Sequence, residues 1–207
     1  MNIEVKISKK KIDYNFAINY MEKRLDKVIK GEKFELLWIL EHNSIYTCGI
    51  RSDKKNILNK GIKVIKTNRG GKITHHGPGQ KIIYFVINLN KRKKDIRYLL
   101  TKIEKCIIKI LKHYKINSFS DRKNVGIWVK EKKNIKKIAA IGIKVKKWVA
   151  FHGFSINVDN DLDYYKNIIP CGINDKGITR IKDLTNKNLQ NINQIIKKNL
   201  ILSFKKI

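Results

Sequence analysis

The chain has 207 residues, of which 42% are hydrophobic, and it carries a formal net charge of +30. This length suits one substantial domain and is short for two, and the composition excludes an intrinsically disordered chain. The N-terminal stretch MNIEVKISKKK lacks an apolar segment of signal-peptide length, and the most apolar runs are far shorter than a membrane span. We therefore expect one domain over residues 1–207, located in the cytoplasm.

The apolar residues follow helical and strand periods in alternation along the chain. In chain order, these patterns predict a helix at 15–31, strands at 34–42, 63–69 and 81–90, a helix at 97–116, consecutive strands across 125–158 with a turn near 132–134, a short helix or turn at 162–169, and a helix at 188–207. Strands and helices mix without a strict strand–helix–strand repeat. This order predicts an α+β fold built on one sheet.

The excess of positive charge has two explanations. One is attraction to a polyanion such as nucleic acid. The other is composition, because Lys, Ile and Asn are all abundant and AT-rich codons encode all three. The 47 basic residues are scattered rather than gathered in one stripe, which favours composition. A nucleic-acid-binding protein stays the alternative from another functional class, and it predicts a clustered basic face with exposed aromatic side chains.

Three cysteines are too few for a disulfide framework, and no C-x-x-C or H-x-x-x-H spacing indicates a metal site. Cys106 lies on the apolar face of the helix at 97–116, which is typical of a packed thiol. Cys48 ends a strand, and a structural role is favoured. Cys171 lies between Pro170 and Gly172 in a loop, and these residues favour a packed thiol and a nucleophile about equally.

Two further stretches are candidates for ligand binding. The sequence NRGGKITHHGPGQK at 68–81 holds four glycines, which let backbone approach a ligand closely. It does not fit a phosphate-binding glycine motif, and a binding loop is favoured over an ordinary hairpin loop. The stretch at 136–159 places Ala139, Ala140 and Gly142 in an apolar strand. Small side chains there are explained equally well by tight packing and by room for a ligand.

Taken together, the pieces EHNSIYTCG, RGGKITHHGPGQ, KIAAIGIKV, FHGFSINVDNDLDYYKNIIPCGI and GITRIKDL resemble the lipoyl(octanoyl) transferases of lipoate biosynthesis. They follow the family's order over about residues 35–185. The resemblance implies the mixed-sheet catalytic fold of biotin and lipoate protein ligases. It also implies transfer of an octanoyl group, without a cofactor, from octanoyl-acyl carrier protein to a lysine of lipoyl domains. These domains belong to 2-oxoacid dehydrogenase complexes and to the H protein of glycine cleavage.

The resemblance also implies which residues act. The family's nucleophile falls on Cys171, and its catalytic lysine falls on Lys137, whereas the adjacent Lys136 would point to the opposite face of a strand. A cationic lysine beside a thiol favours the thiolate, which attacks the acyl thioester. The substrate contacts of the family fall on Arg69, Gly70, Gly71, Lys72, Ile73, Thr74, His75, His76, Ala140, Ile141, Gly142, Gly153, Phe154 and Ser155.

The sequence departs from the family pattern at three of these positions. His75 stands where an aromatic Tyr is usual, and Lys72 and Ser155 also replace commoner residues. Two alternatives share the fold. An ATP-dependent lipoate protein ligase would not need Cys171, and a catalytically inactive acyl-binding protein would need neither Cys171 nor Lys137.

Overall fold

The computed structural model describes residues 2–170 and 176–204 of the chain. In this part of the chain, the large sheet has the strand order β1-β2-β6-β10-β9-β8-β7, with β11 paired to β9. Its strands are β1 (Ile3–Ile7), β2 (Glu35–Leu40), β6 (Gln80–Asn88), β7 (Ser118–Ser120), β8 (Ile127–Glu131), β9 (Asn134–Lys146), β10 (Val149–Asn157) and β11 (Gly177–Ile178). The pairs β1–β2 and β9–β11 are parallel and the others are antiparallel, so the sheet is mixed, as expected.

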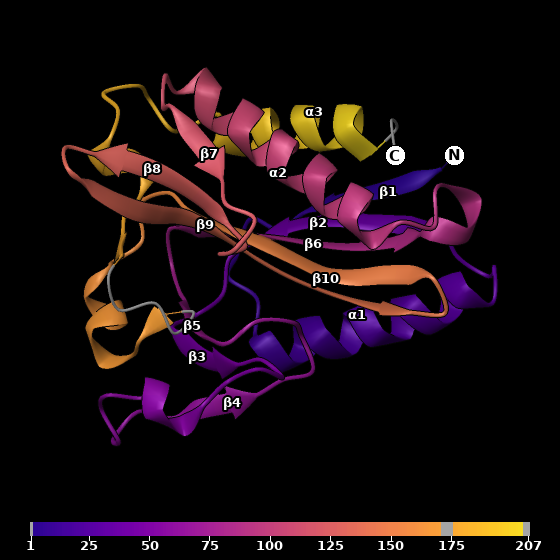
Figure 1. Cartoon of the computed structure of the whole chain (residues 1–207). Coiled ribbons are helices and arrows are strands. Elements are labelled where there is room, and N and C mark those ends of the chain that lie inside the picture. The colour runs from indigo at the N-terminus through magenta and orange to yellow at the C-terminus, as the bar shows by residue number, and fades with distance from the viewer. Residues whose placement is uncertain (1, 171–175, 205–207) are drawn as a thin grey trace.

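Within residues 2–170 and 176–204, three α-helices cover the two faces of this sheet: α1 (Tyr14–Ile29), α2 (Ile96–His113) and α3 (Ile192–Phe204). Helices α2 and α3 lie on one face and α1 lies on the other (Figure 1). Each of the first two begins at an aspartate, because Asp13 Oδ1 accepts from Phe16 N at 2.8 Å and Asp95 Oδ1 accepts from Tyr98 N at 2.9 Å. Both helices predicted from apolar spacing therefore begin at an aspartate that caps the first turn.

Two apolar clusters hold the layers together. The larger one joins α2 and α3 to the face of the sheet that they cover, and it includes the fully buried Cys106. The prediction that this thiol packs in the core is confirmed, and burial raises its pKa to about 11. The second cluster joins α1 to the opposite face of the sheet. No helix in the described residues is long and apolar enough to cross a membrane.

A second sheet lies on the α1 side, below the large sheet (Figure 1). It consists of β4 (Val64–Lys66), β3 (Ile45–Cys48) and β5 (Ile73–His76), in that order. The expectation of one sheet was therefore wrong. The two strands expected to flank the glycine-rich loop belong to different sheets, and part of the loop itself forms β5. Its short sequence, ITHH, has no apolar alternation that would have indicated a strand.

Candidate active site

A narrow pocket lies between the two sheets. Its walls include Tyr14 of α1, Arg69 and His76 from the glycine-rich stretch, and Tyr84 and His152 from the large sheet. The other residues that line it are Gly71, Lys72, Ile73, Thr74, Ile82, Ala140, Ile141, Gly142, Gly153, Phe154 and Ser155. The structure therefore brings the candidate stretches at 68–81 and 136–159 to one place.

Small residues form the floor of this pocket. Strand β10 runs between β6 and β9, and Gly153 pairs with Gly142 on β9 and with Tyr84 on β6. Two residues along, Ser155 pairs with Ala140. Side chains two apart share one face of a strand, so these positions leave a shallow track across the sheet. An apolar chain can lie in such a track without displacing a large side chain.

The glycine-rich loop forms the roof. A Cβ atom on Gly70 would lie 2.8 Å from Ile143 O, and one on Gly142 would lie 3.0 Å from Gly70 O. The loop therefore rests directly on β9, and glycines at both contacts make this close approach possible. The Arg69 side chain reaches the small sheet, where its Nη2 donates to Thr47 O at 2.7 Å and to Thr47 Oγ1 at 2.9 Å. These contacts hold the guanidinium at the wall of the pocket.

Lys137 faces the pocket side of the sheet because of a β-bulge. Ile127 pairs with Ala139 and Trp128 pairs with Lys137, so Ile138 is an extra residue on β9. Both Ile138 and Ala139 belong to the core cluster under α2 and α3. The extra residue shifts the alternation of side chains along β9 by one. Lys137 therefore lies on the pocket side of the sheet, the side on which Trp128 also lies. The side chain is 4% exposed, and its Nζ donates to Val125 O at 3.2 Å.

The neighbouring Lys136 has a different environment. Its Nζ lies 2.6 Å from Glu131 Oε1 in a partly exposed ion pair. This agrees with the expectation that the two lysines point to different sides of the strand. Only Lys137 is buried on the side that carries Ala140 and Gly142.

A buried chain of amides orients His76. The carbonyl oxygen of Thr179 can only accept, so Asn157 donates to it through Nδ2 at 3.0 Å. Asn157 Oδ1 then accepts from Gln80 Nε2 at 2.8 Å, and Gln80 Oε1 accepts from His76 Nδ1 at 2.7 Å. His76 is thus neutral with its proton on Nδ1, and Nε2 is an acceptor. Burial and the nearby Arg69 hold its pKa well below 6.5.

His152 is held in a similar way from the opposite wall. Its Nε2 donates to Asn68 Oδ1 at 2.7 Å, because Asn68 uses Nδ2 to donate to Glu22 Oε1 at 3.0 Å. Burial, with Arg69 and Lys144 nearby, lowers its pKa to about 3. The backbone of His152 has φ +68°, in the left-handed region that non-glycine residues rarely adopt. Strain of this kind concentrates at functional sites, which fits its place in the pocket wall.

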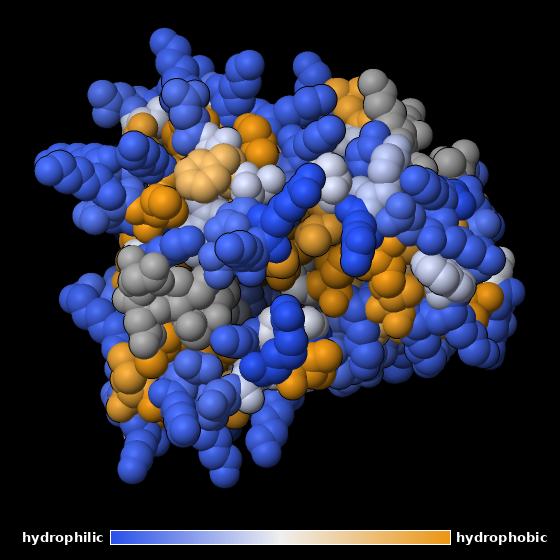
Figure 2. All heavy atoms as spheres, viewed as in Figure 1, coloured by the Kyte–Doolittle hydropathy of each residue, from blue (hydrophilic) through white to orange (hydrophobic). Residues whose placement is uncertain are grey.

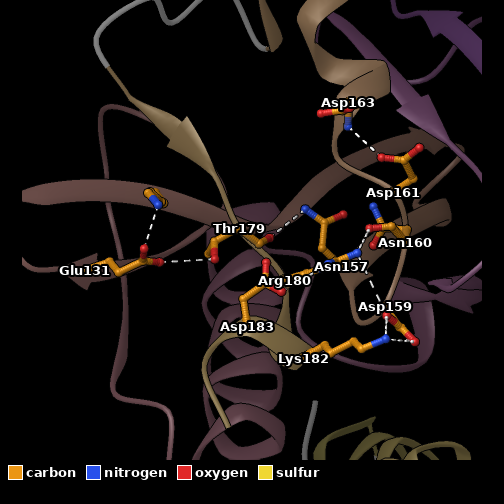
Figure 3. A network of polar contacts seen from close by, with 11 residues as sticks. Glu131, Asn157, Asp159, Asn160, Asp161, Asp163, Thr179, Arg180, Lys182 and Asp183 are labelled. Atoms are coloured by element: carbon orange, nitrogen blue, oxygen red, sulfur yellow. Dashed lines mark hydrogen bonds and ion pairs between the residues drawn. The ribbon is translucent and has the colours of Figure 1, made fainter.

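Figure 3 shows how the strand next to Lys137 is secured. Thr179 follows β11, and its Oγ1 lies 3.3 Å from Glu131 Oε2 while its carbonyl accepts from Asn157 (Figure 3). Its N–H also donates to Lys137 O at 3.0 Å. One residue therefore connects the ion-paired end of β8, the amide chain of the pocket and the backbone of Lys137.

Two of the expected substrate contacts lie off the pocket lining. Gly70 packs against β9, as described above, and His75 points to the other side of β5. The His75 ring stacks on Tyr164 with centroids 4.3 Å apart, and its Nε2 lies 2.8 Å from Ser44 Oγ. Burial lowers its pKa to about 4. His75, which stands where the family usually has a tyrosine, therefore contacts Tyr164 and Ser44 of the protein and does not line the pocket.

We expect His75 to make the fold sensitive to acid. Its pKa is lowered on folding, so the unfolded chain binds a proton between about pH 6.5 and 4 and the folded chain does not. The free energy of unfolding therefore decreases as the pH is lowered through this window, by about 1.4 kcal/mol per pH unit for one such group. His75→Tyr should reduce that slope while keeping a stacked ring on Tyr164. Urea unfolding of both proteins at pH 7 and pH 5 measures how much each loses in free energy of unfolding between the two pH values. An equal loss in both proteins would contradict the assignment of acid sensitivity to His75.

The expected nucleophile, Cys171, lies outside the described residues. Of the other cysteines, Cys48 is partly exposed and lines a different hollow, together with residues of the segment from Gly49 to Thr67. In the described residues, no group of three or more His, Cys, Asp or Glu side chains is placed to hold a metal ion.

Two aromatic residues of the pocket lining, and the buried Gln80 behind His76, were not singled out from the sequence. Tyr14 and Tyr84 carry aromatic rings that look like ordinary core residues in a helix and a strand. Gln80 precedes an apolar run, and only its complete burial in the structure marks it as a functional candidate. A polar residue at a buried strand position is the signal that would have indicated it, because buried amides need partners.

The sequence is similar to proteins of known family. Residues 13–202 match the model of the lipoyl protein ligase A/B catalytic domain. An octanoyltransferase of Wolbachia sp. subsp. Brugia malayi is 41% identical over 198 residues, covering 95% of this chain and 97% of the relative. An octanoyltransferase of Ehrlichia chaffeensis is 42% identical over 184 residues, covering 88% and 86% of the two chains.

Solved structures share the fold. A lipoate-protein ligase A bound with ATP gives a TM-score of 0.77 at 15% identity, over 99% of this chain and 86% of the other. A bipartite lipoate protein ligase from Thermoplasma acidophilum gives 0.75 at 12% identity, over 99% and 84%. The α+β fold expected for biotin and lipoate ligases is confirmed. The chain belongs to the lipoyl protein ligase A/B catalytic domain family, and within it to the octanoyltransferases, which are acyltransferases.

Proposed function

We propose that the chain moves an octanoyl group from octanoyl-acyl carrier protein, through a thioester on Cys171, to a lysine of lipoyl domains. The acceptors are the lipoyl domains of 2-oxoacid dehydrogenase complexes and the H protein of glycine cleavage. The observation that carries this proposal is the pocket, in which a track of small residues lies on the same face of the sheet as buried Lys137. The track suits an apolar acyl chain, and the lysine suits proton transfer.

The first half of the reaction loads the enzyme. The thiolate of Cys171 attacks the carbonyl carbon of the octanoyl thioester, and the carrier leaves as a thiol after taking up a proton. Lys137 as an ammonium ion favours the thiolate and supplies that proton. Backbone N–H groups of the Arg69 loop, or those next to Cys171, stabilise the oxyanion of the tetrahedral intermediate.

The second half transfers the chain. The ε-amine of the lipoyl-domain lysine attacks the Cys171 thioester, the amide forms, and the thiolate is released. Lys137, now a neutral amine, accepts the proton from the attacking nitrogen and returns to its starting state. The energy comes from exchanging a thioester for an amide, so the reaction does not need ATP.

The basic surface has a place in this scheme. Acyl carrier proteins are acidic, and attraction between opposite charges speeds encounter. Hydrophilic side chains are spread over the visible face of the molecule, between apolar patches, and do not form a single stripe (Figure 2). The 47 basic residues are scattered along the sequence, which fits a general attraction better than a nucleic-acid groove.

Intact-protein mass spectrometry after mixing with octanoyl-acyl carrier protein tests the proposal. We expect the wild-type protein to gain one octanoyl group that hydroxylamine removes, and Cys171→Ala to gain none. Cys48→Ala is the matched control and should load normally. Adding a lipoyl domain should return the enzyme to its unmodified mass and place the octanoyl group on the acceptor lysine. A folded wild-type protein that stays unmodified, or a Cys171→Ala protein that loads equally, would overturn the covalent route.

A further inference from the structure

The indole ring of Trp128 lies directly beside the candidate catalytic lysine. Trp128 is on β8, is 1% exposed and pairs across the strands with Lys137. Its flanking residues on β8 point into the core under α2 and α3, whereas the indole is on the pocket side. The ring N–H donates to Asn124 O at 2.8 Å, which fixes the orientation of the plane. The aromatic face is therefore a rigid surface.

Two ammonium groups meet this ring. Lys137 Nζ lies 4.6 Å from the ring centroid, and Lys176 Nζ lies 4.8 Å from it. Both distances fall inside the range of a cation–π interaction, and Trp is the most effective aromatic partner. Lys176 is tied at its other side to Asp121, with Nζ 3.4 Å from Oδ2. It is also the fifth residue after Cys171 in the sequence.

Further contacts of Lys137 also restrict its side chain. Its Nζ donates to Val125 O at 3.2 Å. A Cβ atom on Gly126 would lie 3.1 Å from Lys137 Cε, and Gly126 has φ +138°, so a glycine is needed where the loop passes the lysine. The side chain is thus confined between a loop on one side and the indole on the other.

An aromatic ring suits a lysine that must exchange a proton. It attracts the ammonium form through its quadrupole, and it does not itself accept or release protons. The attraction is also weaker than that of a buried carboxylate, so the lysine is held in place without being locked in its charged form. The ring therefore attracts the nitrogen in the half of the cycle in which it is an ammonium ion, and in the other half it confines the neutral amine by contact, together with the Gly126 loop.

We propose that Trp128 is a positioning residue for Lys137, and that its indole sets the place of the lysine nitrogen for proton transfer. The proposal rests on the function proposed above. It assigns Trp128 no contact with the substrate. The second cation, Lys176, shares the same ring and thereby fixes the backbone that follows the Cys171 segment in the sequence relative to Lys137.

The test compares Trp128→Leu with Trp128→Phe. Phe keeps an aromatic face and loses the bond to Asn124 O, whereas Leu loses both. We expect Leu to lower kcat for octanoyl transfer about tenfold, and Phe to stay within about threefold of wild type. The KM for octanoyl-acyl carrier protein should change little in either variant, because the ring is assigned no substrate contact.

Trp38 offers a matched control. It is also fully buried, donates its ring N–H to Ser8 Oγ at 2.9 Å, and has Lys6 Nζ 4.4 Å from its centroid. Trp38→Leu removes a comparable buried ring from β2, outside the pocket. We expect it to lower the melting temperature as much as Trp128→Leu while kcat stays near wild type. If kcat falls equally in both variants, the effect of Trp128 is structural and the proposal is wrong.

One measurement does not depend on activity. In protein labelled with 13C at the lysine ε-carbon, the ring current of Trp128 should shift the ε-methylene signals of Lys137 and Lys176, assigned through Lys137→Arg and Lys176→Arg. Both shifts should disappear in Trp128→Leu and persist in Trp128→Phe. Unshifted wild-type signals would overturn the inference whatever the enzyme does. Shifted signals in a protein that transfers no octanoyl group would instead count against the proposed function.

Discussion

Lys137→Met is expected to lower kcat for octanoyl transfer about a thousandfold, which is the usual contribution of a positioned acid–base group. Methionine fills nearly the same volume in the confined site and cannot carry a proton. Loss of activity should therefore come without loss of the fold. Single-turnover rates with octanoyl-acyl carrier protein and a lipoyl domain measure the effect, and a thermal melt of each protein reports the fold.

The neighbouring lysine supplies the control for this change. Lys136 pairs with Glu131 at a partly exposed position, on the other side of the strand. Lys136→Met should keep kcat within about threefold of wild type, because exposed ion pairs contribute about 1 kcal/mol or less. Lys137→Arg should be as inactive as Lys137→Met, since a guanidinium does not give up its proton near neutral pH. A Lys137→Met protein within tenfold of wild type would exclude an acid–base role for this residue.

Gly153→Ala is expected to lower the free energy of unfolding by about 4 kcal/mol or more, which is exceptional for one methyl group. A Cβ atom there would overlap Ile83 O and lie 2.9 Å from Ile83 C, so β6 and β10 would have to separate at the centre of the sheet. Backbone atoms cannot rotate away as a flexible side chain can. Urea unfolding, together with soluble yield and circular dichroism, measures the loss.

Gly61→Ala is the matched substitution for Gly153→Ala. Gly61 is exposed, and the nearest atom to its added Cβ is Asn59 Oδ1 at 3.3 Å, on a side chain that can move. Its effect should stay within about 1 kcal/mol, the ordinary range for a glycine replaced by alanine without strain. If Gly153→Ala were as mild as Gly61→Ala, the close contact between β6 and β10 would not hold in solution.

Local sequence patterns predicted most elements of secondary structure well. Helices α1 and α2 and the turn between β8 and β9 lie where apolar spacing and polar turn residues indicated. The predictions missed β1, although its sequence IEVKI alternates apolar and charged residues, and they missed β5, whose sequence ITHH has no such alternation. They also gave no sign of the second sheet, because pairing between β3, β4 and β5 depends on contacts between distant segments.

The amide chain behind His76 shows the same limit at the site. The motif HHGPGQ gives two histidines as candidates, but it does not say which histidine enters the pocket. In the structure, His76 points inward and is held by Gln80, whereas His75 stacks outside on Tyr164. The partner that orients Gln80 is Asn157, which lies 77 residues later in the chain. No local pattern contains that pairing.

The sequence by itself determined the kinds of residue that are available: a loop cysteine, a lysine that begins a strand of small residues, and a glycine-rich loop. Tertiary structure decided which way they face. By simple alternation Lys137 and Ala140 would lie on opposite sides of β9. The extra residue Ile138 exists only relative to the pairing of β9 with β8, and it turns Lys137 to the pocket side. A bulge is a property of two strands together, so one strand's sequence does not specify it.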